Sequence, residues 1–190
     1  MCPTVVDDYP VALPGSFESS SSLVVVTGVP GAGKTTLGSA VAIALGVPFL
    51  SLDAMKESLY ARGAGNRDAY ELRLAAEAEL AVRLMAAEGT VVVDIWVAPE
   101  RDTERITTLL QRQGKLIIEL MCRVPAHVAV TRYVSRRRSA PHLPADEPTL
   151  ERIRDAVDVL EPLGIGCCIE VDTSRPVHLD EVLDRLELQL

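Results

Sequence analysis

Features that mark several other classes of protein are missing from this sequence of 190 residues. Its four cysteines form no C-x-x-C pair, and no histidine stands at zinc-finger spacing, so neither a metal site of that kind nor a disulfide framework is indicated. No apolar run approaches the roughly 18 residues that a membrane span requires. The first basic residue is Lys34, so the basic segment of a signal peptide is missing too. We expect a cytoplasmic protein with reduced thiols.

Positive charge is also scarce. Lys and Arg together number 19 against 27 Asp and Glu, which gives a formal net charge of -8. Such a charge repels phosphate backbones at long range, so it argues against general binding of nucleic acids or anionic membranes. Any contact with a polyanion must therefore be local. The dense basic cluster comprises Arg132, Arg136, Arg137 and Arg138.

Apolar residues make up 48% of the chain, which is enough for one globular domain with a core. Residues 1–22 hold three prolines and a run of four serines, a composition typical of a disordered arm, so we expect the domain to span residues 23–190. Residues 139–148 hold three further prolines and suit neither helix nor strand. We expect a short, mobile lid at about 138–149.

Short runs rich in β-branched residues alternate with longer segments of helical character. V-V-V occurs at 24–26 and again at 91–93, and strands that are apolar on successive residues are typical of a sheet covered on both faces. The alternation predicts an α/β fold with a five-stranded parallel sheet and helices on both faces. Expected strands are 23–27, 47–52, 90–95, 115–121 and 167–171; expected helices are 35–45, 67–88, 99–112, 125–138, 149–160 and 178–188.

The strongest motif is G-V-P-G-A-G-K-T at 28–35, a complete G-x-x-x-x-G-K-[ST] phosphate-binding loop. An apolar strand precedes it and an Ala-rich helix follows it, so backbone N–H groups and the helix N-terminus can cradle phosphates. We expect Lys34 to bridge the terminal phosphates of ATP and Thr35 to hold Mg²⁺. The nucleotide contacts expected here are Gly28, Val29, Pro30, Gly31, Ala32, Gly33, Lys34, Thr35 and Thr36.

Two acidic residues follow expected strands at the edge of the sheet where parallel α/β proteins place their working groups. Asp53 follows F-L-S-L, and Asp94 ends V-V-V-D. A carboxylate that faces the terminal phosphate can accept the proton of an attacking hydroxyl, and we assign this role to Asp53. We assign Asp94 to the Mg²⁺ site, where it acts through bound water. Two plainer interpretations stay open: Asp53 as the N-cap of a helix that begins at Ala54, and Asp94 as a strand-end turn residue.

Arg132 and Arg136 are four residues apart, on one face of the expected helix at 125–138. Two guanidinium groups on that face can clamp the phosphoryl group as it transfers. A solvated basic face is the alternative. A nucleic-acid patch is less favoured, because Tyr133 is the one aromatic residue interleaved with these arginines.

With these motifs in order, residues 23–190 resemble the adenylate kinase-like branch of P-loop kinases. More specifically, they resemble the small ATP-dependent kinases that include chloramphenicol phosphotransferase-like, polynucleotide kinase-like and related AAA domain proteins. The resemblance implies a sheet order of 2-3-1-4-5, and it places Asp53 and Lys56 where an acid and a base contact the acceptor. It also implies that V-V-V-D is the Walker B strand and that Arg132 and Arg136 bind nucleotide phosphates. The segment V-D-T-S-R-P-V resembles the loop that packs on adenine, which implicates Thr173, Ser174, Arg175 and Pro176.

One departure from that family concerns the acceptor. Nucleoside monophosphate kinases carry an arginine shortly after the Walker B strand, whereas I-W-V-A-P follows Asp94 here. This weakens the case for a phosphorylated nucleotide as acceptor. Trp96 can instead stack on an uncharged or aromatic acceptor, or it can be a core residue. Several residues of the acceptor-side segment are expected mostly on helix surfaces: Tyr60, Arg62, Arg67, Tyr70 and Arg73.

The sequence therefore predicts an ATP-dependent kinase that transfers the γ-phosphoryl group to a hydroxyl of a small molecule, with Mg²⁺ as cofactor. Two alternatives stay open, a kinase for a nucleic-acid 5′-hydroxyl and a nucleotide-binding regulator with little turnover. A GTPase switch is disfavoured because the chain holds no N-K-x-D string. The expected catalytic residues are Lys34, Asp53, Arg132 and Arg136; Asp53, Lys56 and Trp96 are expected to bind the acceptor, Thr35 and Asp94 the metal, and Arg132, Arg175 and Pro176 the nucleotide.

Overall fold

A computed structural model of the chain describes residues 21–64, 68–136 and 142–190. Its five strands form one sheet in the order β2-β3-β1-β4-β5, and each neighbouring pair is parallel. The predicted parallel sheet and the strand order that the resemblance implied are both confirmed. The strands are β1 (Ser22–Thr27), β2 (Phe49–Ser51), β3 (Val91–Asp94), β4 (Leu116–Arg123) and β5 (Cys167–Asp172).

The helices lie near their expected positions, with differences at their ends. The helix expected at 99–112 begins only at Thr103, because residues 95–102 form a loop. The helix expected at 125–138 ends at Ser135, since Arg136 has an extended backbone with ψ of 127°. The helices are α1 (Lys34–Leu45), α2 (Leu52–Leu59), the π-helical turn η1 (Tyr60–Ala64), α3 (Ala69–Ala86), α4 (Thr103–Gln111), α5 (Ala126–Ser135), α6 (Glu147–Asp158) and α7 (Leu179–Glu187).

Alternate residues of the central strand face opposite sides of the sheet, and both sides are covered. Val24 and Val26 belong to one buried cluster, which includes residues of α1, α5, α6 and α7. Leu23 and Val25 belong to a second cluster with residues of α3 and α4. The V-V-V runs predicted this arrangement, because a strand buried on both faces gains from apolar side chains at every position.

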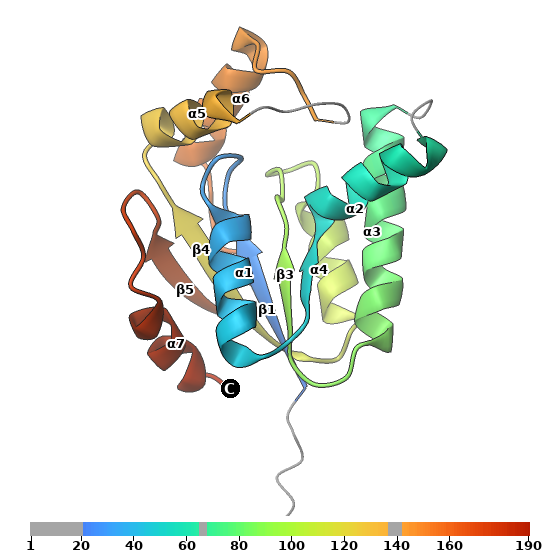
Figure 1. Ribbon diagram of the computed structural model, residues 1–190, viewed down its shortest axis with the longest axis vertical. Helices are drawn as coiled ribbons and strands as arrows, with labels where there is room; N and C mark the ends of the chain where they lie inside the picture. The colour runs from blue at the N-terminus through green and yellow to red at the C-terminus, as the bar shows by residue number, and fades with distance from the viewer. Residues whose placement is uncertain (1–20, 65–67, 137–141) are drawn as a thin grey trace, which may run out of the picture.

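The lid and the arm are described only in part. Of the expected arm, residues 1–20 lie outside the described residues, while Ser22 is buried in β1 and already belongs to the domain. Within the expected lid, residues 138–141 lie outside the described part, and 147–149 form the first turn of α6. In Figure 1, α5 and α6 lie above the end of the sheet that carries the loop between β1 and α1. The top of the sheet is thus roofed on one side by α5 and α6 and flanked on the other by α2 and α3.

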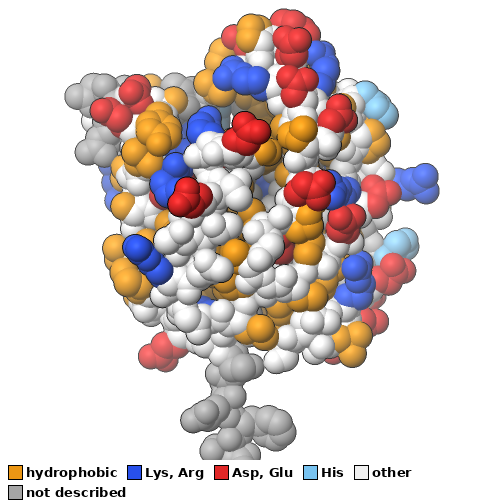
Figure 2. Space-filling model, turned by 180° about the vertical axis from the view of Figure 1, so that it is seen from behind, with side chains coloured by type: hydrophobic (Ala, Val, Ile, Leu, Met, Phe, Trp, Pro, Cys, Tyr) orange, Lys and Arg blue, Asp and Glu red, His pale blue; other side chains and the backbone are white. Residues whose placement is uncertain are grey.

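The rear surface of the molecule carries charges of both signs. On the face shown in Figure 2, Lys and Arg side chains stand among Asp and Glu side chains and do not form a continuous basic area. Among the helices that the structure describes, none has both the length and the apolar character needed to cross a membrane.

Candidate active site

The phosphate-binding loop follows β1 and is packed tightly against α5. Gly28, Gly31 and Gly33 have φ angles of 140°, 88° and 92°, in a region that favours glycine. A Cβ atom on Gly31 would lie 2.2 Å from the carbonyl oxygen of Ala129 in α5. Lys34 begins α1, is buried, and donates from Nζ to the carbonyl oxygen of Val29 at 3.1 Å. The loop therefore wraps around the ammonium group of Lys34.

Gly31→Ala should destabilise the protein more than Gly164→Ala, by roughly 2–3 kcal/mol. Both glycines have positive φ, 88° and 69°, but an added Cβ meets a carbonyl only at Gly31, whereas nothing lies within 4 Å at Gly164. The pair therefore separates the close packing of the loop from the backbone preference. Urea unfolding of both variants measures the difference, and ATP affinity should fall only in Gly31→Ala. Equal losses of stability would contradict the tight packing of the loop against α5.

Asp94 joins the phosphate loop to the end of β2. Its Oδ2 atom accepts hydrogen bonds from the hydroxyl groups of Thr35 at 2.5 Å and Ser51 at 3.2 Å. Asp94 is buried at the end of β3, whereas the Thr35 side chain at the start of α1 is exposed. A hydroxyl and a carboxylate at one point suit the hard, oxygen-preferring Mg²⁺, which would be held here together with nucleotide phosphates. The sequence brought Thr35 and Asp94 into one predicted site, but it did not point to Ser51. The one signal for Ser51 was its place at the end of an expected strand.

Asp53 lies in the first turn of α2, and it is not the helix cap. The N-cap is Ser51, whose hydroxyl accepts a hydrogen bond from the backbone N–H of Ala54 at 3.4 Å. The interpretation of Asp53 as a plain N-cap was therefore wrong, because the helix begins two residues earlier than expected. The carboxylate of Asp53 is exposed and lines the same cavity as Lys34 and Thr35. The carboxylate beside the phosphate loop is therefore not used to cap the helix.

One cavity of about 440 Å³ lies between the phosphate loop, the α2–α3 side and the α5–α6 side. Many of the predicted site residues line this cavity. They are Pro30, Gly31, Gly33, Lys34 and Thr35 of the loop, Asp53 and Lys56 of α2, Trp96, and Arg136. Trp96 also packs against a core cluster, which supports its interpretation as a core residue, and its stacking on an acceptor stays a prediction. The cavity joins the nucleotide side and the acceptor side of the predicted site in one space.

The two predicted clamp arginines lie in different surroundings. Arg132 donates from Nη1 to the carbonyl oxygen of Thr173 at 2.8 Å and from Nη2 to that of Ser174 at 3.2 Å. Arg136 is exposed beyond the end of α5 and lines the cavity. The shared helix face predicted for these residues was wrong, because α5 ends before Arg136.

The loop after β5 lies beside the phosphate loop. The hydroxyl of Thr173 donates to the carbonyl oxygen of Ala32 at 2.6 Å, which ties the two loops together. Ser174 is half-buried, and its backbone N–H donates to the side chain of Asp172 at 2.8 Å, so the chain turns sharply here. Arg175 and Pro176 are exposed. This is the loop that the resemblance linked to adenine, and the hydrogen bond of Thr173 places it beside the phosphate loop.

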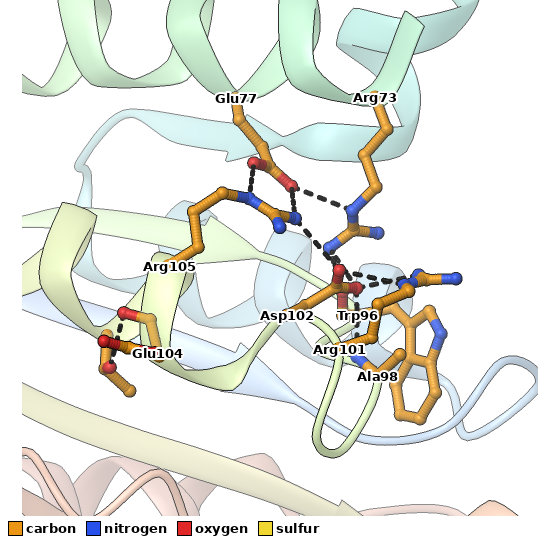
Figure 3. A network of polar contacts seen from close by, with 9 residues as sticks. Arg73, Glu77, Trp96, Ala98, Arg101, Asp102, Glu104 and Arg105 are labelled. Carbon is orange, nitrogen blue, oxygen red and sulfur yellow. Dashed lines mark hydrogen bonds and ion pairs between the residues drawn. The ribbon is translucent and has the colours of Figure 1, made fainter. Parts of the chain in front are cut away.

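A buried ionic network flanks the acceptor side, and the sequence did not reveal it. Arg73 of α3, expected on a helix surface, is only 8% exposed; it donates to Glu77 at 2.8 Å and to the carbonyl oxygen of Trp96 at 2.7 Å. Arg105 donates to both oxygens of Glu77, at 2.7 and 3.0 Å, and to Asp102 at 2.9 Å. Figure 3 shows these groups between α3 and the loop that carries Trp96. The network therefore fixes the loop after β3 to α3.

Asp102 is the centre of this network and is fully buried. It accepts hydrogen bonds from Arg101 at 2.8 and 3.0 Å, and Arg73 lies 3.2 Å away. Burial raises the pKa of its carboxyl group, but the hydrogen bonds from Arg101 and Arg105 and the charge of Arg73 outweigh burial and lower the pKa from 3.8 to about 2. Asp102 is therefore ionised at neutral pH.

The strand order, the phosphate loop after β1 and the contact between Thr35 and Asp94 define a small kinase of the P-loop class. A family model described as an AAA domain matches residues 23–163, and the chain belongs to that family. No curated protein matches the sequence.

Solved structures of kinases share the fold. A protein from Chloroflexus aurantiacus, provisionally assigned as a kinase, is 26% identical, with a TM-score of 0.75 over 90% of this chain and 99% of its own. Shikimate kinase from Acinetobacter baumannii, solved with shikimate, is 21% identical, with a TM-score of 0.63 over 90% and 93% of the two chains. A gluconokinase from Sinorhizobium meliloti is 22% identical, with a TM-score of 0.54 over 90% and 97%. The match over nearly the whole of each chain shows that these proteins share one fold.

Proposed function

We propose that the protein transfers the γ-phosphoryl group of ATP to a hydroxyl group of a small molecule, with Mg²⁺ as cofactor. The observation that carries this proposal is the single cavity lined by Lys34 and Thr35 of the phosphate loop and by Asp53 of α2. A nucleotide held at Lys34 would point its terminal phosphate toward this space, and an acceptor hydroxyl beside Asp53 would be in reach of it. The kinase structures that share the fold, which include shikimate kinase and gluconokinase, support the same reaction class.

The side chains divide the work of such a transfer. Lys34 neutralises charge on the β- and γ-phosphates, while Thr35 and Asp94 hold Mg²⁺, which spreads the remaining charge. Asp53 accepts the proton of the attacking hydroxyl. Arg136 reaches the cavity from the α5–α6 side and stabilises charge on the transferring group. Arg132 has one of two roles: it binds the nucleotide phosphates, or it orders the neighbouring loop through its hydrogen bonds to Thr173 and Ser174. Arg175 and Pro176 contact the adenine.

Asp53→Asn should lower acceptor-dependent turnover by roughly a hundred-fold or more, because the amide cannot take up the proton. ATP affinity should stay within about two-fold, since Asp53 lies on α2 and not in the phosphate loop. The measurement is ADP release from Mg-ATP with a panel of hydroxyl acceptors: nucleosides, sugars, sugar acids, aminoglycoside and phenicol antibiotics, and a 5′-hydroxyl oligonucleotide.

Asp180→Asn is the matched control, because Asp180 lies in the first turn of α7, as Asp53 lies in that of α2, but does not line the cavity. Full activity in both variants would remove Asp53 from the reaction. Turnover with the oligonucleotide that falls steeply with salt would favour the nucleic-acid kinase instead. Tight ATP binding without any acceptor-stimulated turnover would favour the nucleotide-binding regulator.

A further inference from the structure

The cavity is strongly cationic in a chain that is acidic as a whole. Its lining includes six Lys and Arg side chains, and Asp53 is the one carboxylate among the described residues that line it. The chain itself has a net charge of -8. Positive charge has therefore been concentrated at this site. The six cations are Lys34, Lys56, Arg73, Arg101, Arg136 and Arg152.

These cations fall into two groups by the elements that carry them. Lys34 stands at the phosphate loop, and Arg136 and Arg152 come from the α5–α6 side that roofs it. The phosphates of ATP account for this first group. Lys56 of α2, Arg73 of α3 and Arg101 of the loop before α4 lie on the acceptor side, and the proposed nucleotide position gives them no phosphate to bind.

Arg101 is held in place and still open to the cavity. Its Nε and Nη2 atoms donate to Asp102, yet 56% of its side chain is exposed. The preceding residue, Glu100, has a φ of 61°, a left-handed conformation that costs a non-glycine residue energy and fixes the direction of the chain before Arg101. Arg101 is thus a preorganised cation at the cavity wall.

The ionic network behind Arg101 leaves an excess of positive charge. Three guanidinium groups, those of Arg73, Arg101 and Arg105, surround two carboxylates, those of Glu77 and Asp102. The contacts of Arg73 described above use its Nε and Nη2 atoms, and its side chain reaches the cavity wall. An anion bound beside Arg73 and Arg101 would balance this excess.

Apolar side chains adjoin the same cations. Tyr70, Trp96, Ala98 and Pro99 line the same cavity as Arg73 and Arg101, and Figure 3 shows Trp96 and Arg101 on the loop between β3 and α4. We propose that the acceptor is a small organic anion, a hydroxyl compound whose carboxylate or phosphate group is bound by Arg101 and Arg73 while its carbon skeleton lies on Trp96. This inference rests on the proposed kinase function, and it replaces the uncharged acceptor that Trp96 alone suggested.

The first test measures binding without any chemistry. Trp96 is the only tryptophan of the chain, so its fluorescence reports on the acceptor side of the cavity. The protein is loaded with Mg²⁺ and a non-hydrolysable ATP analogue, so that the phosphate loop is occupied, and titrated with matched probes. One arm uses small hydroxy acids against their primary amides; the other uses sugar and polyol phosphates against the parent alcohols.

We expect saturable binding of at least one anionic probe, and binding of its uncharged counterpart at least about ten-fold weaker, the scale of one lost charge-assisted hydrogen bond. Arg101→Gln should raise the dissociation constant of that anion about ten-fold. Arg112→Gln, a change at an exposed arginine at the other end of α4, should leave it unchanged. The arm that responds identifies the anion as a carboxylate or a phosphate.

Equal binding of charged and uncharged partners, no binding of any anionic probe, or no effect of Arg101→Gln would each overturn the inference. ADP release with the same probes separates it from the proposed function. If an anion binds through Arg101 but neither it nor any other probe is phosphorylated, the kinase proposal is refuted, whereas the anion site is supported. An uncharged probe that is phosphorylated best, with a KM unaffected by Arg101→Gln, would refute the anion site and keep the kinase.

Discussion

Lys34→Ala should lower kcat for phosphoryl transfer by roughly a thousand-fold or more, the scale of losing a cation that stabilises charge on the transferring group. Lys34 is buried in the phosphate loop, and its ammonium group contacts the carbonyl oxygen of Val29 at 3.1 Å. That position lets it reach phosphates cradled by the loop without any large movement. Alanine removes the charge from a site where solvent cannot replace it well. The decrease is measured as ADP release at saturating Mg-ATP and acceptor.

A suitable control is a second lysine whose ammonium group also donates to backbone carbonyl oxygens but lies outside the cavity. Lys115→Ala serves, because Lys115 donates to the carbonyl oxygens of Ala87 and Gly89 at 2.9 and 2.8 Å, at the opposite end of the sheet. Its effect on turnover should stay within about two-fold, since it touches no part of the cavity. Calorimetric titration with ATP shows whether Lys34→Ala also weakens ground-state binding. A turnover within ten-fold of the wild type would mean that the phosphate loop does not serve catalysis here.

The fold could be predicted from the sequence because its signals are local. The V-V-V runs indicate strands covered on both faces, and the glycine-rich string at 28–35 needs a strand before it and a helix after it. The order of the strands did not follow from such patterns; it came from the resemblance to P-loop kinases. Helix ends were predicted less well. Contacts with Arg73, which is distant in sequence, hold the loop at 95–102, and α5 ends at Ser135, before the extended residue Arg136.

The meeting of Thr35 with Asp94 could be predicted for a similar reason, whereas the ionic network around Asp102 could not. Thr35 and Asp94 each stand at a strand or helix end, where a parallel sheet brings side chains together. Arg73 instead joins α3 to Asp102 across the fold. A signal was present, because Arg73 and Glu77 continue the face of α3 that buries Leu80 and Leu84. A charged pair on an apolar helix face indicates a buried ionic partner elsewhere, but the sequence alone does not say which one.

Asp102→Asn should lower the free energy of unfolding at pH 7 by about 3–5 kcal/mol, because breaking a buried ion pair leaves charges without compensation. Asp102 is fully buried and faces the guanidinium groups of Arg73, Arg101 and Arg105. Asparagine keeps the volume but turns N–H donors toward groups that are already donors. Urea unfolding measures the loss, and Tm should fall by roughly 10 °C for a chain of this length.

Glu147→Gln provides the matched control. Glu147 pairs with Arg154 at 2.6 Å, but 71% of its side chain is exposed, so removing this charge should cost less than about 1 kcal/mol. A cost for Asp102→Asn no larger than this would show that the network adds little to the stability of the fold.

The effect of Asp102→Asn should also depend on pH in a defined direction. The folded state lowers the pKa of Asp102 from 3.8 to about 2, so this carboxylate stabilises the protein above pH 4 and loses that contribution as the pH falls toward 2. The difference in unfolding free energy between wild type and variant should therefore stay constant from pH 7 to about pH 4.5 and shrink below it. Urea unfolding at a series of pH values measures this difference. If the difference in unfolding free energy changed between pH 5 and 7, a group other than Asp102 would be titrating, and the central role of Asp102 in the network would be contradicted.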